Sequence, residues 1–324
     1  MQGSRLAALV AAIGLAALRA AAQPIPIDAG IPAYKVTSGV SGNLNSIGSD
    51  TLNDTMTLWA EAFRTRYPNI KTQIEGKGSS TAPPALIDGT AQLGPMSREM
   101  KPTEIDAFEK KYGYKPTAYR VAVDALAVWV NKDNPLAKAT LPQIDAIFSK
   151  TRRCGAPAAI DDWSQLGLAG VFKDRRISLY GRNSASGTYG YFKEHALCNG
   201  DFRDEVKEQP GSASVVQGVS EDTFAMGYSG MGYRTSGVKA LDLAKADGQP
   251  YGKAEASDVY AGHYPLSRFL FVYVNQKPGQ APDPLVREFL RFVLSHPGQE
   301  VVVKAGFLPI TQPIDDEERK KLGS

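Results

Sequence analysis

Short apolar or β-branched runs alternate along this chain with helical stretches, and turns of small residues separate them. Apolar residues recur every three or four positions over residues 51–67, which predicts an amphipathic helix that ends at Pro68. Residues 69–75 predict a strand, followed by the small-residue turn 76–80 and a short helix through Ile87. A repeated order of strand, turn and helix is typical of α/β architecture, so we expect an α/β fold.

Two further segments of strand character, residues 122–131 and 269–275, each end in a polar turn that contains proline. A protein of two lobes whose chain crosses twice between them needs two such segments. We expect these strands to join lobe I, formed by residues 23–123 and 265–324, to lobe II, formed by residues 124–264. A predicted helix at residues 285–294 would belong to lobe I, and a ligand would lie between the lobes.

The N-terminal 22 residues have the pattern of a secretory signal peptide. Arg5 is followed by an apolar run over residues 6–18, and three alanines precede Gln23. A run of this length is too short to span a bilayer comfortably, and no cysteine follows it to carry a lipid anchor. We therefore expect cleavage after Ala22 and export of the mature chain.

The charge balance excludes some classes of partner. Lys and Arg number 37 against 34 Asp and Glu, a net charge of +3. Loss of Arg5 and Arg19 with the signal peptide leaves 35 against 34, or +1. Bulk charge of this size does not indicate binding to nucleic acid or to an anionic membrane. A small anion would need a local site.

The two cysteines, Cys154 and Cys198, lie 44 positions apart. In an oxidising compartment this spacing favours a structural disulfide over a redox or metal site, and the alternative is two buried free thiols. His195, His263 and His296 have no metal-ligand spacing. We expect no metal and no cofactor.

Three clusters of Ser, Thr and Gly precede predicted helices, at residues 48–51, 78–81 and 182–188. Free backbone N–H groups, short hydroxyls and a helix dipole together bind oxyanions without a metal. The third cluster adds Arg182, whose planar fork matches an edge of a phosphate group. Any one cluster could simply be a helix N-cap, but three in one chain favour an anion site.

These motifs also carry a family resemblance. The pattern Arg182-x-x-x-Ser186-Gly187-Thr188, with a Gly-Ser-Ser turn after a strand and a Gly-Ser-x-Thr turn near the mature N-terminus, resembles the phosphate-binding proteins of bacterial ABC transporters. The resemblance implies a type II periplasmic binding fold, with two α/β lobes joined by two crossover strands that close on one phosphate. It implies these phosphate-binding residues: Ser79, Arg182, Ser186, Gly187 and Thr188, with Ser49, Asp50 and Thr51 on the first loop.

The same resemblance implies a periplasmic, monomeric protein that takes up inorganic phosphate and passes it to an ABC transporter permease at the inner membrane. Nucleic acid is not an expected partner. Neither a catalytic residue nor an enzymatic activity is expected.

One position departs from the best-known members of the family. They carry an Asp that accepts the proton of hydrogen phosphate, and Ser97 stands there in this chain, followed by Arg98. Asp50 could accept that proton instead, or Asp50 or Ser49 could simply cap the first helix. Arg98 could supply a second cation to the site, or pair with a surface carboxylate such as Glu99 or Asp88.

Two other functions remain open on the residues alone. A protein of this fold could bind another oxyanion, such as sulfate, molybdate or a phosphate ester. An exported phosphatase could use Ser79 or Ser186 as its nucleophile, but it would need a general base or metal ions beside that serine. The sequence has no His or carboxylate cluster with suitable spacing.

Overall fold

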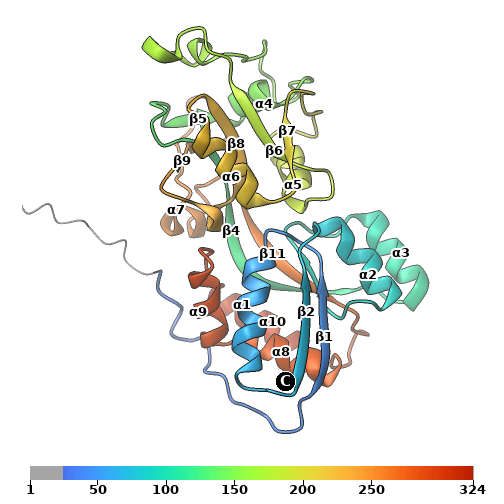
Figure 1. Ribbon diagram of the computed structural model, residues 1–324. Coiled ribbons are helices and arrows are strands. Elements are labelled where there is room, and N and C mark those ends of the chain that lie inside the picture. Colours follow the sequence, from blue (N-terminus) through green and yellow to red (C-terminus); the bar gives the residue numbers. More distant parts are fainter. Residues whose placement is uncertain (1–24, 324) are drawn as a thin grey trace, which may run out of the picture.

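The computed structural model describes residues 25–323, and the predicted signal peptide and its cleavage site lie outside them. The chain forms two α/β lobes, and the strands β4 (Thr117–Asn131) and β11 (Ser267–Val274) run between them (Figure 1). Within residues 25–323, no helix has the length and apolar character needed to cross a membrane. The predicted α/β fold with two lobes and two crossover strands is confirmed.

Lobe I contains the parallel pair β1–β2, the short strand β3 and six helices among the described residues. Its elements are β1 (Gly42–Ile47), α1 (Asn53–Arg64), β2 (Ile70–Glu75), α2 (Ala82–Asp88), β3 (Gly94–Met96), α3 (Pro102–Tyr112), α8 (Pro284–Val293), α9 (His296–Lys304) and α10 (Gln312–Lys321).

Lobe II contains the remaining strands and four helices among the described residues. Its elements are β5 (Lys138–Thr140), α4 (Leu141–Phe148), β6 (Ser178–Arg182), α5 (Gly187–His195), β7 (Lys207–Gln209), α6 (Ser212–Glu221), β8 (Ala225–Gly230), β9 (Val238–Ala240), β10 (Asp242–Ala244) and α7 (Ala256–Tyr260).

One mixed sheet extends through both lobes in the order β3-β11-β4-β8-β6-β7, with β9 also paired to β4. The long strand β4 makes this possible because its two halves have different partners. Residues 117–125 pair antiparallel with β11, and residues 126–131 pair with β8 and β9. The crossover strands are therefore hydrogen-bonded to each other where the lobes meet.

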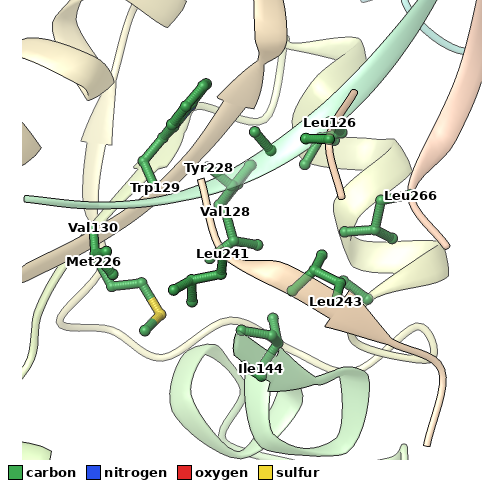
Figure 2. Packing of buried hydrophobic residues seen from close by; sticks show 14 of the residues in the cluster. Leu126, Val128, Trp129, Val130, Ile144, Met226, Tyr228, Leu241, Leu243 and Leu266 are labelled. Carbon is green, nitrogen blue, oxygen red and sulfur yellow. The ribbon is translucent and has the colours of Figure 1, made fainter. Parts of the chain in front are cut away.

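Each lobe buries its own hydrophobic core. In lobe II, Leu126, Val128 and Val130 of β4 pack with residues of β8, α4 and β10, and Figure 2 shows this cluster around Leu241 and Ile144. In lobe I, the apolar face of α1 packs with α8 and α9, and includes the fully buried Trp59 and Phe63. Lobes with cores of their own can move as rigid bodies about the strands that join them.

The predicted elements agree with the structure in kind and differ at their ends. Helix α1 is shorter than the predicted 51–67 at both ends, because residues 51 and 52 belong to the loop that precedes it and the helix ends at Arg64. Helix α8 lies within one residue of its predicted bounds, and its Asp283 N-cap accepts hydrogen bonds from Leu285 N and Val286 N. Strand β4 begins earlier than predicted, at Thr117.

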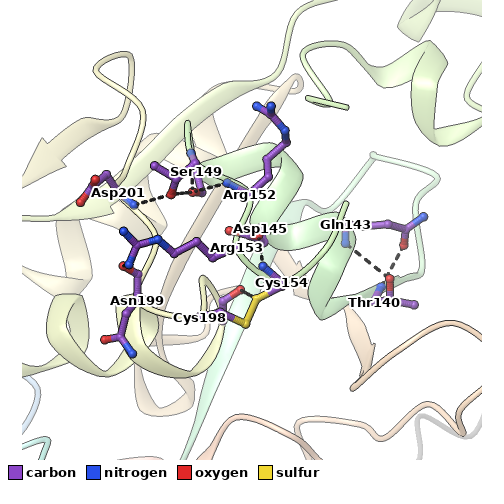
Figure 3. The surroundings of a disulfide bond; sticks show 12 residues. Thr140, Gln143, Asp145, Ser149, Arg152, Arg153, Cys154, Cys198, Asn199 and Asp201 are labelled. Atoms are coloured by element: carbon purple, nitrogen blue, oxygen red, sulfur yellow. Dashed lines mark hydrogen bonds between the residues drawn. A yellow bond between two sulfur atoms is a disulfide. The ribbon is translucent and has the colours of Figure 1, made fainter. Parts of the chain in front are cut away.

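The predicted disulfide joins Cys154 to Cys198 in lobe II, which excludes the alternative of two free thiols (Figure 3). The carboxylate of Asp145, on α4, accepts a hydrogen bond of 2.7 Å from Cys154 N. Burial raises the pKa of this aspartate above its ordinary value. The disulfide joins the loop after α4 to the residues that follow α5.

Candidate functional site

The three small-residue clusters of the sequence lie together where the lobes meet. The first is the loop between β1 and α1, the second is the 3-10 turn Ser79–Thr81 after β2, and the third precedes and begins α5. The hydroxyls of Thr51 and Thr188 are hydrogen-bonded at 2.9 Å, and Ser80 N donates to the Ala185 carbonyl at 3.1 Å. Residues of both lobes thus form one site.

Four buried hydroxyls form the centre of this site, and we call Thr51, Ser79, Ser97 and Thr188 the hydroxyl cluster. The Ser79 and Ser97 hydroxyls lie 3.3 Å apart, and Ser97 N donates to Ser79 Oγ at 3.0 Å. The Ser97 and Thr188 hydroxyls lie 3.5 Å apart. Hydroxyls can turn their protons toward an anion, so the cluster supplies adaptable donors.

The N-terminus of α5 faces the hydroxyl cluster. Ser186 is its N-cap, and its hydroxyl accepts hydrogen bonds from Thr188 N and Tyr189 N. At Gly187 a Cβ atom would lie 2.3 Å from Ser79 Oγ and 2.6 Å from Ser97 Oγ. A glycine is therefore required for the helix to approach the hydroxyls of lobe I this closely, and its end carries the positive pole of the helix dipole.

Arg182, at the end of β6, is only 1% exposed. Its Nη1 donates to Ser212 Oγ at 2.7 Å and its Nη2 to the Pro210 carbonyl at 3.1 Å. Its Nε is buried and has no hydrogen-bond partner among the described residues. Burial lowers the pKa of Arg182, although Asp50 opposes the shift. A buried guanidinium with an unused donor favours an anionic partner, because an unpaired donor costs desolvation energy.

Asp50 links the two lobes instead of capping α1. Its Oδ2 lies 3.1 Å from Arg182 Nη2 and accepts hydrogen bonds from Ser212 N at 2.9 Å and Ser212 Oγ at 3.1 Å. The N-cap position of α1 is Leu52, with no side-chain cap, so the capping interpretation of Asp50 or Ser49 is wrong. The Ser49 hydroxyl is buried and has no partner among residues 25–323.

Arg98 lies at the edge of the site and pairs with Glu104 rather than with the side chain of Glu99 or Asp88. Its Nη1 and Nη2 donate to the two carboxylate oxygens of Glu104 at 2.8 and 2.7 Å, and Nη2 also reaches Ser80 Oγ at 3.2 Å. Burial raises the pKa of Glu104, but the hydrogen bonds from Arg98 and from Lys101 N, together with the charges of these two residues, outweigh burial and leave that pKa below its ordinary value.

Four further residues contact the site, and the sequence did not single them out. Arg268 donates to Thr188 Oγ1, Asp124 accepts from Arg268, Ser212 binds both Arg182 and Asp50, and the Tyr233 hydroxyl donates to the Asp50 carbonyl. For Arg268 and Asp124, the sequence carries a signal that could have identified them. A charged residue inside or beside a buried apolar strand, as at 124 and 268, needs a partner.

A cavity of about 820 Å³ opens beside the hydroxyl cluster, between the lobes. Its lining includes Arg98 and Lys101 from lobe I, Tyr191 and Lys193 from lobe II, and Arg268 from β11. Among residues 25–323, no group of His, Cys, Asp or Glu side chains is arranged to hold a metal ion.

Comparison with known proteins identifies the class. Residues 35–297 match the model of the PBP superfamily domain. A structure from Clostridium perfringens with bound phosphate shares the fold, with a TM-score of 0.69 and 24% identity over 83% of this chain and all of that one. An ABC-type phosphate transport receptor from Vibrio cholerae does so too, with a TM-score of 0.63 and 23% identity over 82% of this chain and all of the receptor. The chain belongs to the PBP superfamily.

The sequence relatives are more specific. The phosphate-binding protein PstS of Pseudomonas aeruginosa is 54% identical over 321 residues, which cover 98% of this chain and 99% of the relative. PstS of Bacillus subtilis is 29% identical over 278 residues, 84% of this chain and 82% of the relative. Within the superfamily, the chain therefore belongs to the family of the PstS proteins, whose members are named as binding proteins.

Proposed function

We propose that this protein captures inorganic phosphate between its lobes and delivers it to an ABC transporter permease at the inner membrane. The observation that carries the proposal is the guanidinium of Arg182. It is buried, it pairs with Asp50, the residue before Thr51 of the hydroxyl cluster, and its Nε has no partner among the described residues. The names of the relatives support phosphate as the ligand.

The affinity would come from donors that are already in place. The hydroxyl cluster, the first turn of α5 and Arg182 would replace the hydration shell of the anion. Each charge-assisted hydrogen bond contributes about 1.5–3 kcal/mol, so several of them reach micromolar affinity or better after the cost of closure. Asp50 would hold the lobes together, since it binds Arg182 and Ser212 across the cleft.

We further propose the lobe boundaries given above, with residues 124–264 as lobe II and residues 23–123 and 265–324 as lobe I. The hydrophobic cores support a first boundary near residue 123, because a lobe I core includes Val121 and Ala122 and the lobe II core includes Val123 and the residues of β4 that follow it; Leu266 and Leu308 also join the lobe II core. The apolar N-terminus supports export to the periplasm by a cleaved signal peptide. We also propose that the protein acts as a monomer.

Asp50 is our candidate for the acceptor of the proton of hydrogen phosphate, since Ser97 stands where other members carry Asp. Sulfate has no proton to donate and would leave the carboxylate facing an anion, so an acceptor disfavours sulfate. Titrations of Asp50→Asn with phosphate and with sulfate test this role. Unchanged discrimination between the two anions would show that Asp50 is not the acceptor.

A thermal-shift experiment in phosphate-free buffer tests the function. A ligand that binds only the folded state raises the melting temperature, so phosphate should raise it more than sulfate, molybdate or arsenate at equal concentration. A larger shift with another oxyanion would favour a binder of that anion. The absence of hydrolysis of a chromogenic phosphate ester would support a binding protein, and turnover would support a phosphatase.

A further inference from the structure

A second guanidinium, that of Arg268, reaches the hydroxyl cluster from β11, at the point where this strand pairs with β4. It is 7% exposed. Its Nη2 donates to Thr188 Oγ1 at 2.9 Å, and its Nη1 donates to the carbonyl of Ser97 at 2.7 Å. This one side chain thus donates hydrogen bonds to two of the four residues of the hydroxyl cluster.

Asp124 fixes the position of that guanidinium. The two residues are direct partners in the register of β4 and β11. Asp124 is fully buried, and its Oδ2 accepts hydrogen bonds from Arg268 Nε at 3.0 Å and Nη2 at 2.7 Å. Its Oδ1 accepts from Met231 N at 3.0 Å. A buried ion pair with these contacts orients its arginine, whatever its net contribution to stability.

The other face of the same guanidinium lies against Tyr191 and lines the cavity. Its Cζ lies 5.2 Å from the centre of the Tyr191 ring. Burial raises the pKa of Tyr191 to about 12, so the ring carries a neutral hydroxyl, which donates to the Ser267 carbonyl at 2.7 Å. Arg268 therefore borders both the cavity and the hydroxyl cluster.

We propose that Arg268 is a second guanidinium ligand of the bound anion, and that Asp124 is the residue that positions it. This inference rests on the proposed function. The Nη2 group that now meets the Thr188 hydroxyl would donate to an anion oxygen held among the four hydroxyls. Arg182 and Arg268 would then bind a doubly charged tetrahedral oxyanion, hydrogen phosphate, from two directions.

The place of Arg268 in the fold gives it a distinct role. Arg182 belongs to lobe II, and Ser79 and Ser97 belong to lobe I, so these groups meet only when the lobes approach each other. Arg268 lies on β11, one of the two strands that run between the lobes, and it lines the cavity. It would therefore bind an incoming anion before closure, through the side that borders the cavity.

The test compares two double variants that each neutralise an ion pair with a fully buried carboxylate. Arg268→Gln with Asp124→Asn removes the proposed ligand without leaving a carboxylate unpaired. The matched control is Arg120→Gln with Glu318→Gln, a pair that joins β4 to α10. Titration calorimetry with inorganic phosphate should show about a 10- to 150-fold loss of affinity for the first variant, the effect of one charge-assisted hydrogen bond, and less than about a twofold change for the control.

Two further variants distinguish a role of Arg268 as a ligand from a purely structural role. Arg268→Lys keeps a cation beside Asp124, but its single nitrogen cannot occupy the separate positions of the Nε, Nη1 and Nη2 atoms of arginine, so it should also lose at least about tenfold in affinity. For Arg268→Ala, addition of guanidinium at a non-denaturing concentration should restore part of the lost affinity, because the deleted group borders the open cavity.

Each outcome has one meaning. If the wild-type protein, the Arg268→Gln/Asp124→Asn variant and the Arg268→Lys variant all bind phosphate equally tightly, Arg268 is not a ligand. The proposed function would then still stand. A wild-type protein that does not bind phosphate would refute the proposed function itself. Loss of affinity in the Arg268 variants, with the control unchanged, supports the proposal.

Discussion

Substitution of Gly187 by alanine should separate folding from phosphate binding. Gly187 is the first residue of α5, and its backbone does not adopt a positive φ, so alanine fits the helix itself. Replacing glycine by alanine in a helix gains up to about 1 kcal/mol. The added Cβ, however, would lie 2.3 Å from Ser79 Oγ in lobe I. The steric clash therefore lies between the lobes and not within α5.

The size of the effect follows from that distance. Ordinary contact with a Cβ begins at 3.4 Å, so the two lobes would have to separate by about 1 Å at this point. Overpacking of this kind costs about 1–3 kcal/mol. If this cost destabilises only the closed, phosphate-bound form, the affinity for phosphate falls by about 5- to 150-fold. The melting temperature of the phosphate-free protein should stay the same or rise slightly.

Gly190→Ala is the matched control, because it lies on the same helix and its Cβ would lie 3.4 Å from Arg98 Cδ, an ordinary contact. Titration calorimetry with phosphate and thermal melting of both variants measure the two effects. We expect Gly190→Ala to bind phosphate within about threefold of the wild type. Equal affinities for the two variants would show that closure of α5 onto Ser79 is not part of binding.

Three further perturbations have defined outcomes. Thr51→Val keeps the shape of the side chain but removes its hydroxyl, so phosphate affinity by calorimetry should fall about tenfold with little change in melting temperature; an unchanged affinity would exclude Thr51 as a ligand. Replacing both Cys154 and Cys198 by serine should lower the free energy of unfolding in urea by about 2–4 kcal/mol, because the disulfide closes a loop with a separation of 44 residues; no change would mean that the bond does not constrain the unfolded chain. The pKa of Glu104 lies below its unfolded value of 4.5, so its charge stabilises the fold above that pH and the stabilisation is lost as the pH falls through the folded-state pKa. Glu104→Gln should make urea stability less dependent on pH as the pH falls below 4.5, and an identical pH dependence would contradict the pairing with Arg98.

The elements of this fold were predictable because their signals are local. The helix ended by Pro68, the strand that follows and the two apolar crossover segments each depend on periodicity or on a proline, and the structure differs only at their ends. The three small-residue clusters were found for the same reason, since glycine and hydroxyl residues before a helix are recognisable in the chain.

The contacts of the charged side chains were not predictable in the same way. Asp50 precedes a helix and therefore has the pattern of an N-cap, yet its carboxylate binds Arg182 and Ser212, more than 130 residues away in the chain. Asp124 and Arg268 lie in or beside apolar runs, and strand register alone brings them together. Such pairings are set by topology, which a single sequence does not specify.

The most direct test of the account is a calorimetric titration of the wild-type mature protein, freed of bound anion, with inorganic phosphate and in parallel with sulfate. We predict that each chain binds one phosphate with micromolar or tighter affinity and binds sulfate more weakly. No detectable binding of phosphate, or tighter binding of sulfate than of phosphate, would contradict this prediction.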